Sequence, residues 1–293
     1  RKDSAASGQL TYRFPDRAAF TFGGRYQRDK STDVTTQFWF TDSEQVLEDD
    51  VFTWKAGLDF HLGDGHLLYG LVSTGWKNGG NNPGALDGAL DLPPNFEPEE
   101  VTAFEIGSKN TLAGRARLNA VAYYYDYENY QFVQEDPVPF AGGTGNIPSV
   151  SMYGLETELS WLLSDRWRLD SQLSFSDGEI DSDLFVLDPV DFLNSGFGRF
   201  TPTGVSDRAS LRVNLRGNTP PKLVEQSVRI ALGYNLPLQN GNLFTSGIDY
   251  IYRGEFQYRV FNHPEVDTVP AYDVVNLYFQ MDFANLPLTA TLN

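Results

Sequence analysis

Apolar and polar side chains alternate along residues 96–132, and this stretch sets the interpretation of the rest of the chain. On its first arm, Phe104 and Ile106 alternate with polar or small residues. Residues 112–115 then reverse the chain, and residues 116–124 alternate in the same way. A period of two over this length predicts two antiparallel β-strands joined by a tight turn, not a helix.

The same alternation recurs from one end of the chain to the other. Expected strands cover residues 8–14, 18–27, 52–62, 66–76, 102–112, 116–132, 152–163, 167–175, 224–236, 244–253, 274–283 and 288–293. Most of them are longer than the 5–6 residues that are typical of soluble strands. The sequence therefore predicts an all-β fold of about twelve long antiparallel strands.

The connections between these strands alternate strictly between short and long. Short connections follow Phe14, Leu62, Leu112, Leu163, Leu236 and Phe283. The expected long connections are residues 28–50 (with a short strand at 34–40), 77–95, 133–148, 177–222 and 258–270. Structureless loops beyond about 15 residues are uncommon in compact soluble domains. Short turns at one end and long loops at the other are typical of an up-and-down transmembrane barrel.

Composition narrows the class of protein further. Hydrophobic residues make up 41% of the 293 residues, but no apolar run approaches the ~18 residues of a membrane helix. Barrel strands escape this test because their apolar and polar positions average out. A net charge of −17 argues against a nucleic-acid partner, whose phosphates need a basic surface. The absence of cysteine fits a chain that crosses an oxidising compartment and equally one that needs no disulfide.

Candidate catalytic and metal-binding residues are few. His61 and His66 flank a turn without a third ligand nearby, and His263 stands beside Pro264 and Glu265 in an expected loop. The acidic residues between 177 and 191 lack the glycine and terminal glutamate of a calcium-binding EF-hand loop. No nucleophile motif and no phosphate-binding glycine loop occurs in the sequence. We therefore expect no enzyme activity, no cofactor and no metal site.

Charged side chains occupy the polar face of nearly every expected strand. They are Lys55, Asp59, Glu105, Lys109, Arg117, Glu156, Glu158, Arg168, Asp170, Arg229, Asp249 and Arg253. A charge on the lipid side of a barrel costs ~2–4 kcal/mol at mid-membrane, so these residues belong in a wet lumen. We expect them to form ion pairs with neighbouring strands or with a domain inside the lumen.

Five segments resemble TonB-dependent outer-membrane receptors, in that family's order. Residues 52–82 are similar to its mid-barrel hairpin, which ends in an aromatic-Lys-x-Gly-Gly element, and residues 96–109 resemble its P-E…E-l-G-x-K element. Residues 122–131 (AYYYDYENYQ), 153–158 (YGLETE) and 271–276 (AYDVVN) resemble three later strands. No single segment is specific, but the five together span most of the chain.

The resemblance implies that residues 1–293 are a partial barrel domain, roughly strands 10 to 21 of a 22-stranded transmembrane β-barrel in the bacterial outer membrane. The family's plug domain, TonB box and last strand elements have no counterpart in these 293 residues, and we expect Arg1 to be an internal position of a longer sequence. The implied function is active uptake of a scarce nutrient, most often a ferric siderophore. The implied partners are the TonB complex, acting through the plug, and outer-membrane lipid and lipopolysaccharide.

Substrate capture in this family falls to the outer loops and the upper lumen. By strand parity, we expect Trp76, Asn78, Tyr125, Tyr127 and Arg253 to point inward near that end. Aromatic rings and an arginine would suit an anionic, aromatic-bearing ferric siderophore through stacking and charge-assisted hydrogen bonds. The alternative is that these residues line the lumen without contacting a ligand.

Two other classes of protein remain open from the sequence. A passive porin-like channel would share the strand pattern but carry no plug. A soluble β-rich binding module would bury the apolar faces that carry Phe52 and Ile230 in a protein core. The substrate stays unassigned, because the family also takes up cobalamin, haem and saccharides.

Overall fold

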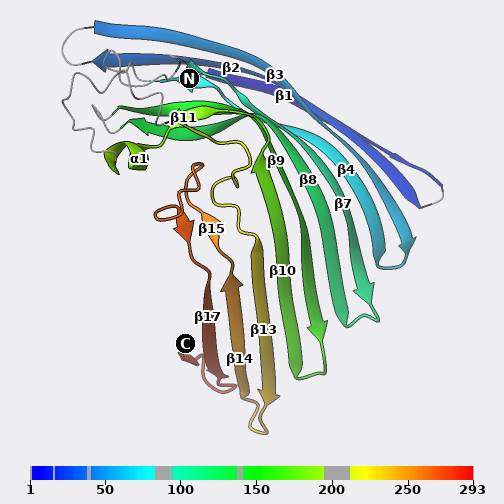
Figure 1. Ribbon diagram of the computed structural model, residues 1–293. Helices are drawn as coiled ribbons and strands as arrows, with labels where there is room; N and C mark the ends of the chain where they lie inside the picture. The colour runs from blue at the N-terminus through cyan, green and yellow to red at the C-terminus, as the bar shows by residue number, and fades with distance from the viewer. Residues whose placement is uncertain are drawn as a thin grey trace.

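The computed structural model describes residues 2–15, 17–37, 41–82, 93, 95–136, 141–194 and 212–292. Twelve strands form one curved antiparallel sheet in which each pairs with the next along the chain (Figure 1). They are β1 (Lys2–Arg13), β2 (Ala18–Gln37), β3 (Thr41–Gly63), β4 (His66–Lys77), β7 (Glu99–Leu112), β8 (Ala116–Asp136), β9 (Ala141–Leu162), β10 (Trp167–Ile180), β13 (Gln226–Pro237), β14 (Leu243–Arg253), β17 (Tyr272–Asp282) and β18 (Thr289–Leu292). The predicted up-and-down order of about twelve strands is confirmed.

Short elements decorate the long connections. Three small hairpins pair β5 (Gly80–Asn81) with β6 (Asn95–Phe96), β11 (Phe185–Leu187) with β12 (Arg212–Asn214), and β15 (Phe256–Gln257) with β16 (Thr268–Val269). The helix α1 (Pro189–Asn194) follows β11. Within the part of the chain that the structure describes, no helix is long and apolar enough to cross a membrane.

The six short connections lie at one end of the sheet, where the sequence places them (Figure 1). At the turn between β7 and β8, Ala113 and Gly114 both have positive φ, 49° and 66°. Two successive residues of this kind make the tight reversal whose twist matches antiparallel strands. At the turn after β13, Gly241 has a φ of 83° and the amide of Leu238 donates to the carbonyl of Asn242 at 2.8 Å.

The outer face of the sheet is a continuous apolar surface. Phe104 lies opposite Val72 on β4 and Tyr124 on β8. Its neighbour Ile106, 59% exposed, lies in register with Ala122. Strand pairing therefore aligns the apolar positions of successive strands into one band.

Exposure of this band rules out the soluble β-rich alternative. That class of protein requires both apolar faces to lie in a protein core, yet Phe52 is 57% exposed and Ile230 is 41% exposed. Contiguous apolar surfaces of this extent are covered by another phase or partner in native proteins.

The inner face is the opposite one, against which the long connections pack. It carries Glu105, Tyr123, Glu156 and Arg229, all in register with residues of the same face on neighbouring strands. Polar and charged side chains on this face can remain hydrated. The two faces thus follow directly from the period of two in the sequence.

Glycines on the inner face lie opposite aromatic rings. Tyr69 pairs with Gly107 across β4 and β7, and a Cβ on that glycine would meet the tyrosine ring at 2.6 Å. Tyr123 and Gly154 on β8 and β9 repeat the arrangement, with a 2.5 Å approach. Each ring lies across the backbone of the next strand because a glycine leaves room for it.

Four strands extend well beyond the 9–11 residues that cross a bilayer. Residues 28–50 were expected to form a long connection with a short strand at 34–40. The strand is confirmed over residues 34–37, but the loop around it is wrong, because β2 and β3 stay paired as far as Gln37 and Thr41. Arg28 pairs with Asp50 across the hairpin at 2.8 Å, and Lys30 pairs with Glu48. These cross-strand ion pairs replace the apolar alternation that marks the membrane-spanning part.

The expected loop at 133–148 is also largely strand. Strands β8 and β9 remain in register to Asp136 and Ala141. The tip of the short strand expected at 34–40, residues 38–40, lies outside the described residues. Of the expected long loop at 177–222, residues 195–211 also lie outside them, and the rest contains β11, α1 and β12.

A compact apolar core forms where the long connections fold over the inner face. Its members are Phe132, Ile147, Val150, Ile180, Val186, Leu215, Val260 and Phe261. The strand β11, which carries Val186, and the neighbouring elements α1 and β15 lie at the end opposite the short turns (Figure 1). This loop core is the main buried cluster of the described residues, because both faces of the sheet below it are partly exposed.

Two asparagines join the connections that build the loop core. The side chain of Asn218, before β13, donates to the carbonyls of Val260 and Phe261 at 2.9 and 3.0 Å. The side chain of Asn262, before β16, exchanges two hydrogen bonds with the backbone of Thr219, at 2.7 and 3.0 Å. The β10–β13 and β14–β17 connections therefore form one unit.

We expect Ile106→Arg to destabilise the folded barrel by ~2–4 kcal/mol, because it places a charge on the outward apolar band. Val121→Arg is the matched control, since Val121 lies on the inner face opposite Gly107. Unfolding free energy in bilayers measures both variants, made in the full gene product. Equal losses for the two variants would contradict the assignment of the faces.

We expect Gly107→Ala to cost ~1–3 kcal/mol of stability, because the added methyl group overlaps the ring of Tyr69. Gly8→Ala, in β1, is the control, because no atom lies within 4 Å of a Cβ at that position. Thermal unfolding compares the two variants. Similar unfolding temperatures for the two variants would contradict this expectation, because the ring of Tyr69 would then move aside without cost.

Candidate functional site

A row of tyrosines runs along the inner face of β8 towards the loop core. Tyr123 stacks on Tyr125 with ring centroids 4.7 Å apart, and Tyr125 meets Tyr127 edge-on at 6.5 Å. Tyr127 meets Tyr130 edge-on at 5.5 Å. Stacked and edge-to-face contacts of this kind fix ring orientation. The structure therefore brings the predicted residues Tyr125 and Tyr127 together and adds Tyr123 and Tyr130 to them.

Tyr130 joins the row through a local break in strand parity. Asn129 has a φ of 54°, opposite Pro148, which has no amide proton to pair with it. Burial, reinforced by the charge of Glu99, raises the pKa of Tyr130 to about 12. Its hydroxyl is therefore protonated at neutral pH.

Asn78 lies at the upper end of this row, in a polar network. Its carbonyl accepts a hydrogen bond from the side chain of Gln131 at 2.8 Å, and its side-chain amide donates to Asp29. The backbone amide of Gln131 donates to Glu99 at 2.7 Å. Asn78 thus ties the end of β4 to β2 and β8.

Arg253 lies apart from the tyrosine row, at the end of β14. Its guanidinium lies over the ring of Phe256, 5.0 Å from the centroid. It lines a hollow of about 870 Å³ on the inner face together with Tyr69, Lys109, Glu156 and Arg229. Its Nε is buried and has no hydrogen-bond partner among the described residues. No ring contact or hydrogen bond within the described chain links Arg253 to Tyr125 or Tyr127.

Trp76 does not point inward. It lies in register with Glu100, on the same face of β4 as Val72 and of β7 as Phe104. The inner face of β4 carries Tyr69 and the positions two, four and six residues further on. The expectation that Trp76 faces the lumen is therefore wrong, and its ring belongs to the outer face.

The inner-face charges form ion pairs in part, as expected. Arg229 on β13 pairs with Asp249 on β14 at 2.9 Å, and Arg168 pairs with Asp170 within β10 at 2.8 Å. Asn119 donates to Glu158 across β8 and β9 at 3.2 Å. These pairs lie along the wall below the loop core and leave the hollow with charges of both signs.

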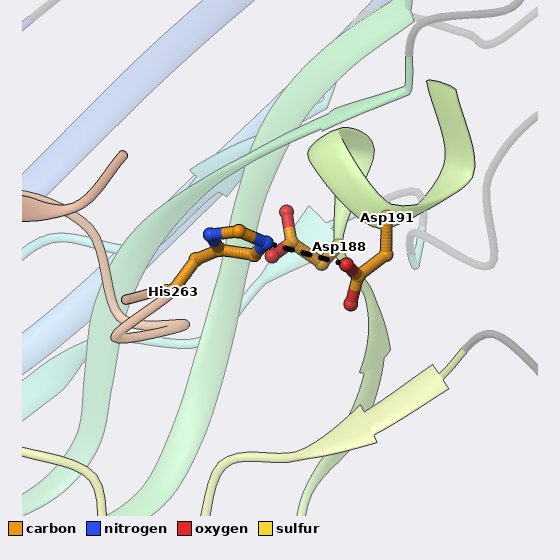
Figure 2. Close-up of side chains that lie close together, drawn as sticks. All are labelled: Asp188, Asp191 and His263. Carbon is orange, nitrogen blue, oxygen red and sulfur yellow. Dashed lines mark ion pairs between the residues drawn. The ribbon is translucent and has the colours of Figure 1, made fainter. Parts of the chain in front are cut away.

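A second cluster lies within the loops. Figure 2 shows the side chains of Asp188, Asp191 and His263, whose potential ligand atoms all lie within 4.8 Å of one another. The Nε2 atom of His263 lies 3.4 Å from a carboxylate oxygen of Asp191. The sequence pointed separately to the acidic segment and to His263, but not to their meeting, because the two lie in different connections.

The extended β2–β3 hairpin contains two adjacent aspartates with opposite environments. Burial, followed by the nearby charges of Asp29 and Glu97, raises the pKa of Asp49. The hydrogen bond from Arg28 lowers the pKa of Asp50. The surroundings therefore disfavour the ionised form of Asp49 and favour the ionised form of Asp50.

The outward apolar band, the inner wall of mixed charge and the loop core at one end are together typical of the wall of an outer-membrane β-barrel. The family described as TonB dependent receptor-like, beta-barrel matches residues 1–293, so the chain belongs to this family. Its members are outer-membrane β-barrels of Gram-negative bacteria, and the outer face of the sheet is accordingly the lipid-facing one. The family is one of transport receptors, not of enzymes.

Known relatives include siderophore receptors. The chain is 27% identical over 135 residues to a probable TonB-dependent siderophore receptor, PiuA, of Acinetobacter baumannii, covering 45% of this chain and 18% of that protein. The ferric yersiniabactin uptake receptor FyuA of Yersinia pestis matches with a TM-score of 0.70 and 17% identity, over 95% of this chain and 38% of that one. The crystal structure of the A. baumannii siderophore receptor PiuA gives a TM-score of 0.70 and 18% identity, over 97% and 37%. These structural matches show the fold, and the chain spans well under half of each relative.

The two aspartates of the β2–β3 hairpin give a pH test. A raised acid pKa means that ionised Asp49 weakens the hairpin at neutral pH, so we expect Asp49→Asn to slow its hydrogen exchange there. Asp50 has a lowered pKa, so its contribution is present above the unfolded pKa of about 3.9 and is lost as pH falls through the folded value. We therefore expect Asp50→Asn to speed exchange at neutral pH.

Both effects are measured by hydrogen exchange of the β2 and β3 amides that lie between Phe52 and the tip of the hairpin. Each variant is compared with wild type at the same pH. Both differences should shrink as the pH falls, since both carboxylates then become protonated. Changes of the same sign at pH 7 would contradict the assigned environments.

Proposed function

We propose that residues 1–293 form a partial barrel domain of an outer-membrane receptor that takes up a ferric siderophore and is energised through TonB. The row of four tyrosines on the inner face carries this proposal. It places aromatic rings and neutral hydroxyl groups along the wall that leads down from the loop core. Membership of the receptor family and the siderophore receptors among its relatives support the same reading.

The tyrosine row would act on a ligand through its rings and its hydroxyl groups. Tyr125 and Tyr127 offer flat surfaces against which an aromatic-bearing ligand can stack. Asn78 would position the upper end of the row through Gln131. Arg253, whose side chain lines the hollow below, would pair with an anionic group further along the path.

The loop core favours a receptor over the passive porin-like alternative. Apolar side chains from two connections pack against the inner face of β8 and β9 at the outer end, where a porin keeps an open passage. An inner face that is covered by loops at the outer end suits a receptor that captures its ligand there and opens only when it is triggered. TonB would supply that trigger through a plug, and outer-membrane lipid and lipopolysaccharide would cover the outer face.

We expect Tyr125→Ala and Tyr127→Ala each to lower the affinity for a ferric siderophore about tenfold, which corresponds to ~1.4 kcal/mol. Tyr124→Ala is the matched control, because Tyr124 lies between them in sequence but points to the outer face, 43% exposed. Binding to the full gene product in detergent, with aromatic and non-aromatic ferric siderophores, measures the effect.

Uptake of iron by an iron-starved strain that expresses the full gene product tests the transport function itself. Equal losses of siderophore affinity in Tyr124→Ala and Tyr125→Ala would show that the tyrosine row is not part of the binding site. No binding and no uptake of any ferric siderophore would contradict the proposed function as a whole.

A further inference from the structure

Asp188, Asp191 and His263 form a cross-loop cluster with an excess of negative charge. Asp188 follows β11, Asp191 lies in α1, and His263 lies between β15 and β16. Asp188 is 1% exposed and Asp267, which accepts the backbone amide of His263 at 2.8 Å, is fully buried. Among the described residues, a single guanidinium, that of Arg259, binds both buried carboxylates.

Arg259 satisfies only part of this charge. It donates to Oδ1 of Asp188 at 3.0 Å and also pairs with Asp267. One positive charge thus serves the two buried carboxylates, and Asp191 adds a third carboxylate within 4.8 Å of Asp188. Buried charges without a counter-charge are costly, so this cluster favours an additional cation.

Asp188 also has an unused ligand atom. Both of its hydrogen bonds, from Arg259 and from the backbone amide of Val190, go to Oδ1. No residue in the described part of the chain donates to Oδ2. This second carboxylate oxygen of Asp188 lies near the imidazole of His263 and the carboxylate of Asp191. Carboxylate oxygens and imidazole nitrogens are both ligands of zinc in proteins.

We propose that Asp188, Asp191 and His263 bind one Zn²⁺ ion that links the β10–β13 and β14–β17 connections. Tetrahedral zinc with bonds of about 2.1 Å to nitrogen and oxygen separates its ligand atoms by about 3.4 Å. The Nε2 of His263 and the carboxylate of Asp191 are already 3.4 Å apart. The carboxylate of Asp191 is 42% exposed, which leaves an entry path and room for water as the fourth ligand.

The imidazole of His263 favours zinc over the hard cations calcium and magnesium. Those ions prefer sites built from oxygen alone, whereas one imidazole with carboxylates suits zinc and its transition-metal neighbours. Without metal, Nδ1 of His263 accepts the backbone amide of Glu265 at 3.2 Å, so Nε2 carries the proton and faces Asp191. Zinc at Nε2 requires the other tautomer, and the Glu265 contact must lengthen to accommodate it.

Zinc binding to the EDTA-treated full gene product in detergent, measured by titration calorimetry, tests this site. We expect one equivalent of Zn²⁺ to bind, and Ca²⁺ at the same concentration not to replace it. We expect His263→Ala and Asp191→Asn each to weaken that binding at least about tenfold. His61→Ala is the matched control, because His61 lies at the opposite end of the sheet beside a short turn.

Asp191→Asn keeps the test valid if His263→Ala disturbs folding, because Asp191 is partly exposed and outside the loop core. Hydrogen exchange of residues 181–191 and 258–267 should slow when zinc is added to wild type and not when it is added to Asp191→Asn. No stoichiometric zinc, or equal zinc affinity in His61→Ala and Asp191→Asn, would overturn the proposal. Neither readout depends on siderophore binding or transport.

Discussion

The structure depends on one constraint, that every backbone amide and carbonyl inside a lipid bilayer must be hydrogen-bonded within the protein. An antiparallel sheet meets it through its ladders, as where β8 pairs with β7 and with β9 along the membrane-spanning length. Strand geometry then sends alternate side chains to opposite faces. One face can be apolar towards lipid and the other polar towards water, which is why so few residues of the sheet itself are buried.

Side chains on the inner face of the sheet are arranged in two ways. Charged residues such as Arg229 and Asp249 pair across strands, where water keeps the cost of the charges low. Aromatic rings such as Tyr69 and Tyr123 lie over glycines on the adjacent strand and occupy the space that a side chain there would take. The tyrosine row follows from the second device, because Tyr123 is held by Gly154 and in turn supports Tyr125.

Beyond the membrane, the strands need other sources of stability. The β2–β3 hairpin relies on cross-strand ion pairs, of which Arg28 with Asp50 is the clearest. The β10–β13 and β14–β17 connections rely instead on a buried apolar core and on paired asparagine side chains. This packing places Asp188 and His263 within reach of each other, which a pair of separate solvated loops would not do.

The sequence by itself determined the strands, the short turns and the identity of the lipid-facing residues wherever one face was clearly apolar, as around Phe104. It did not determine the direction of Trp76, because the strand that carries it has leucines on both faces and only pairing with β7 decides its parity. Nor did it reveal Tyr130, since the positive φ of Asn129 breaks the alternation on which parity rests. Tertiary structure decided the meeting of Asp188 with His263 and the full extension of β2 and β3, of which the sequence predicted only a short strand at 34–40. Ion pairs and loop packing join residues that no local pattern connects.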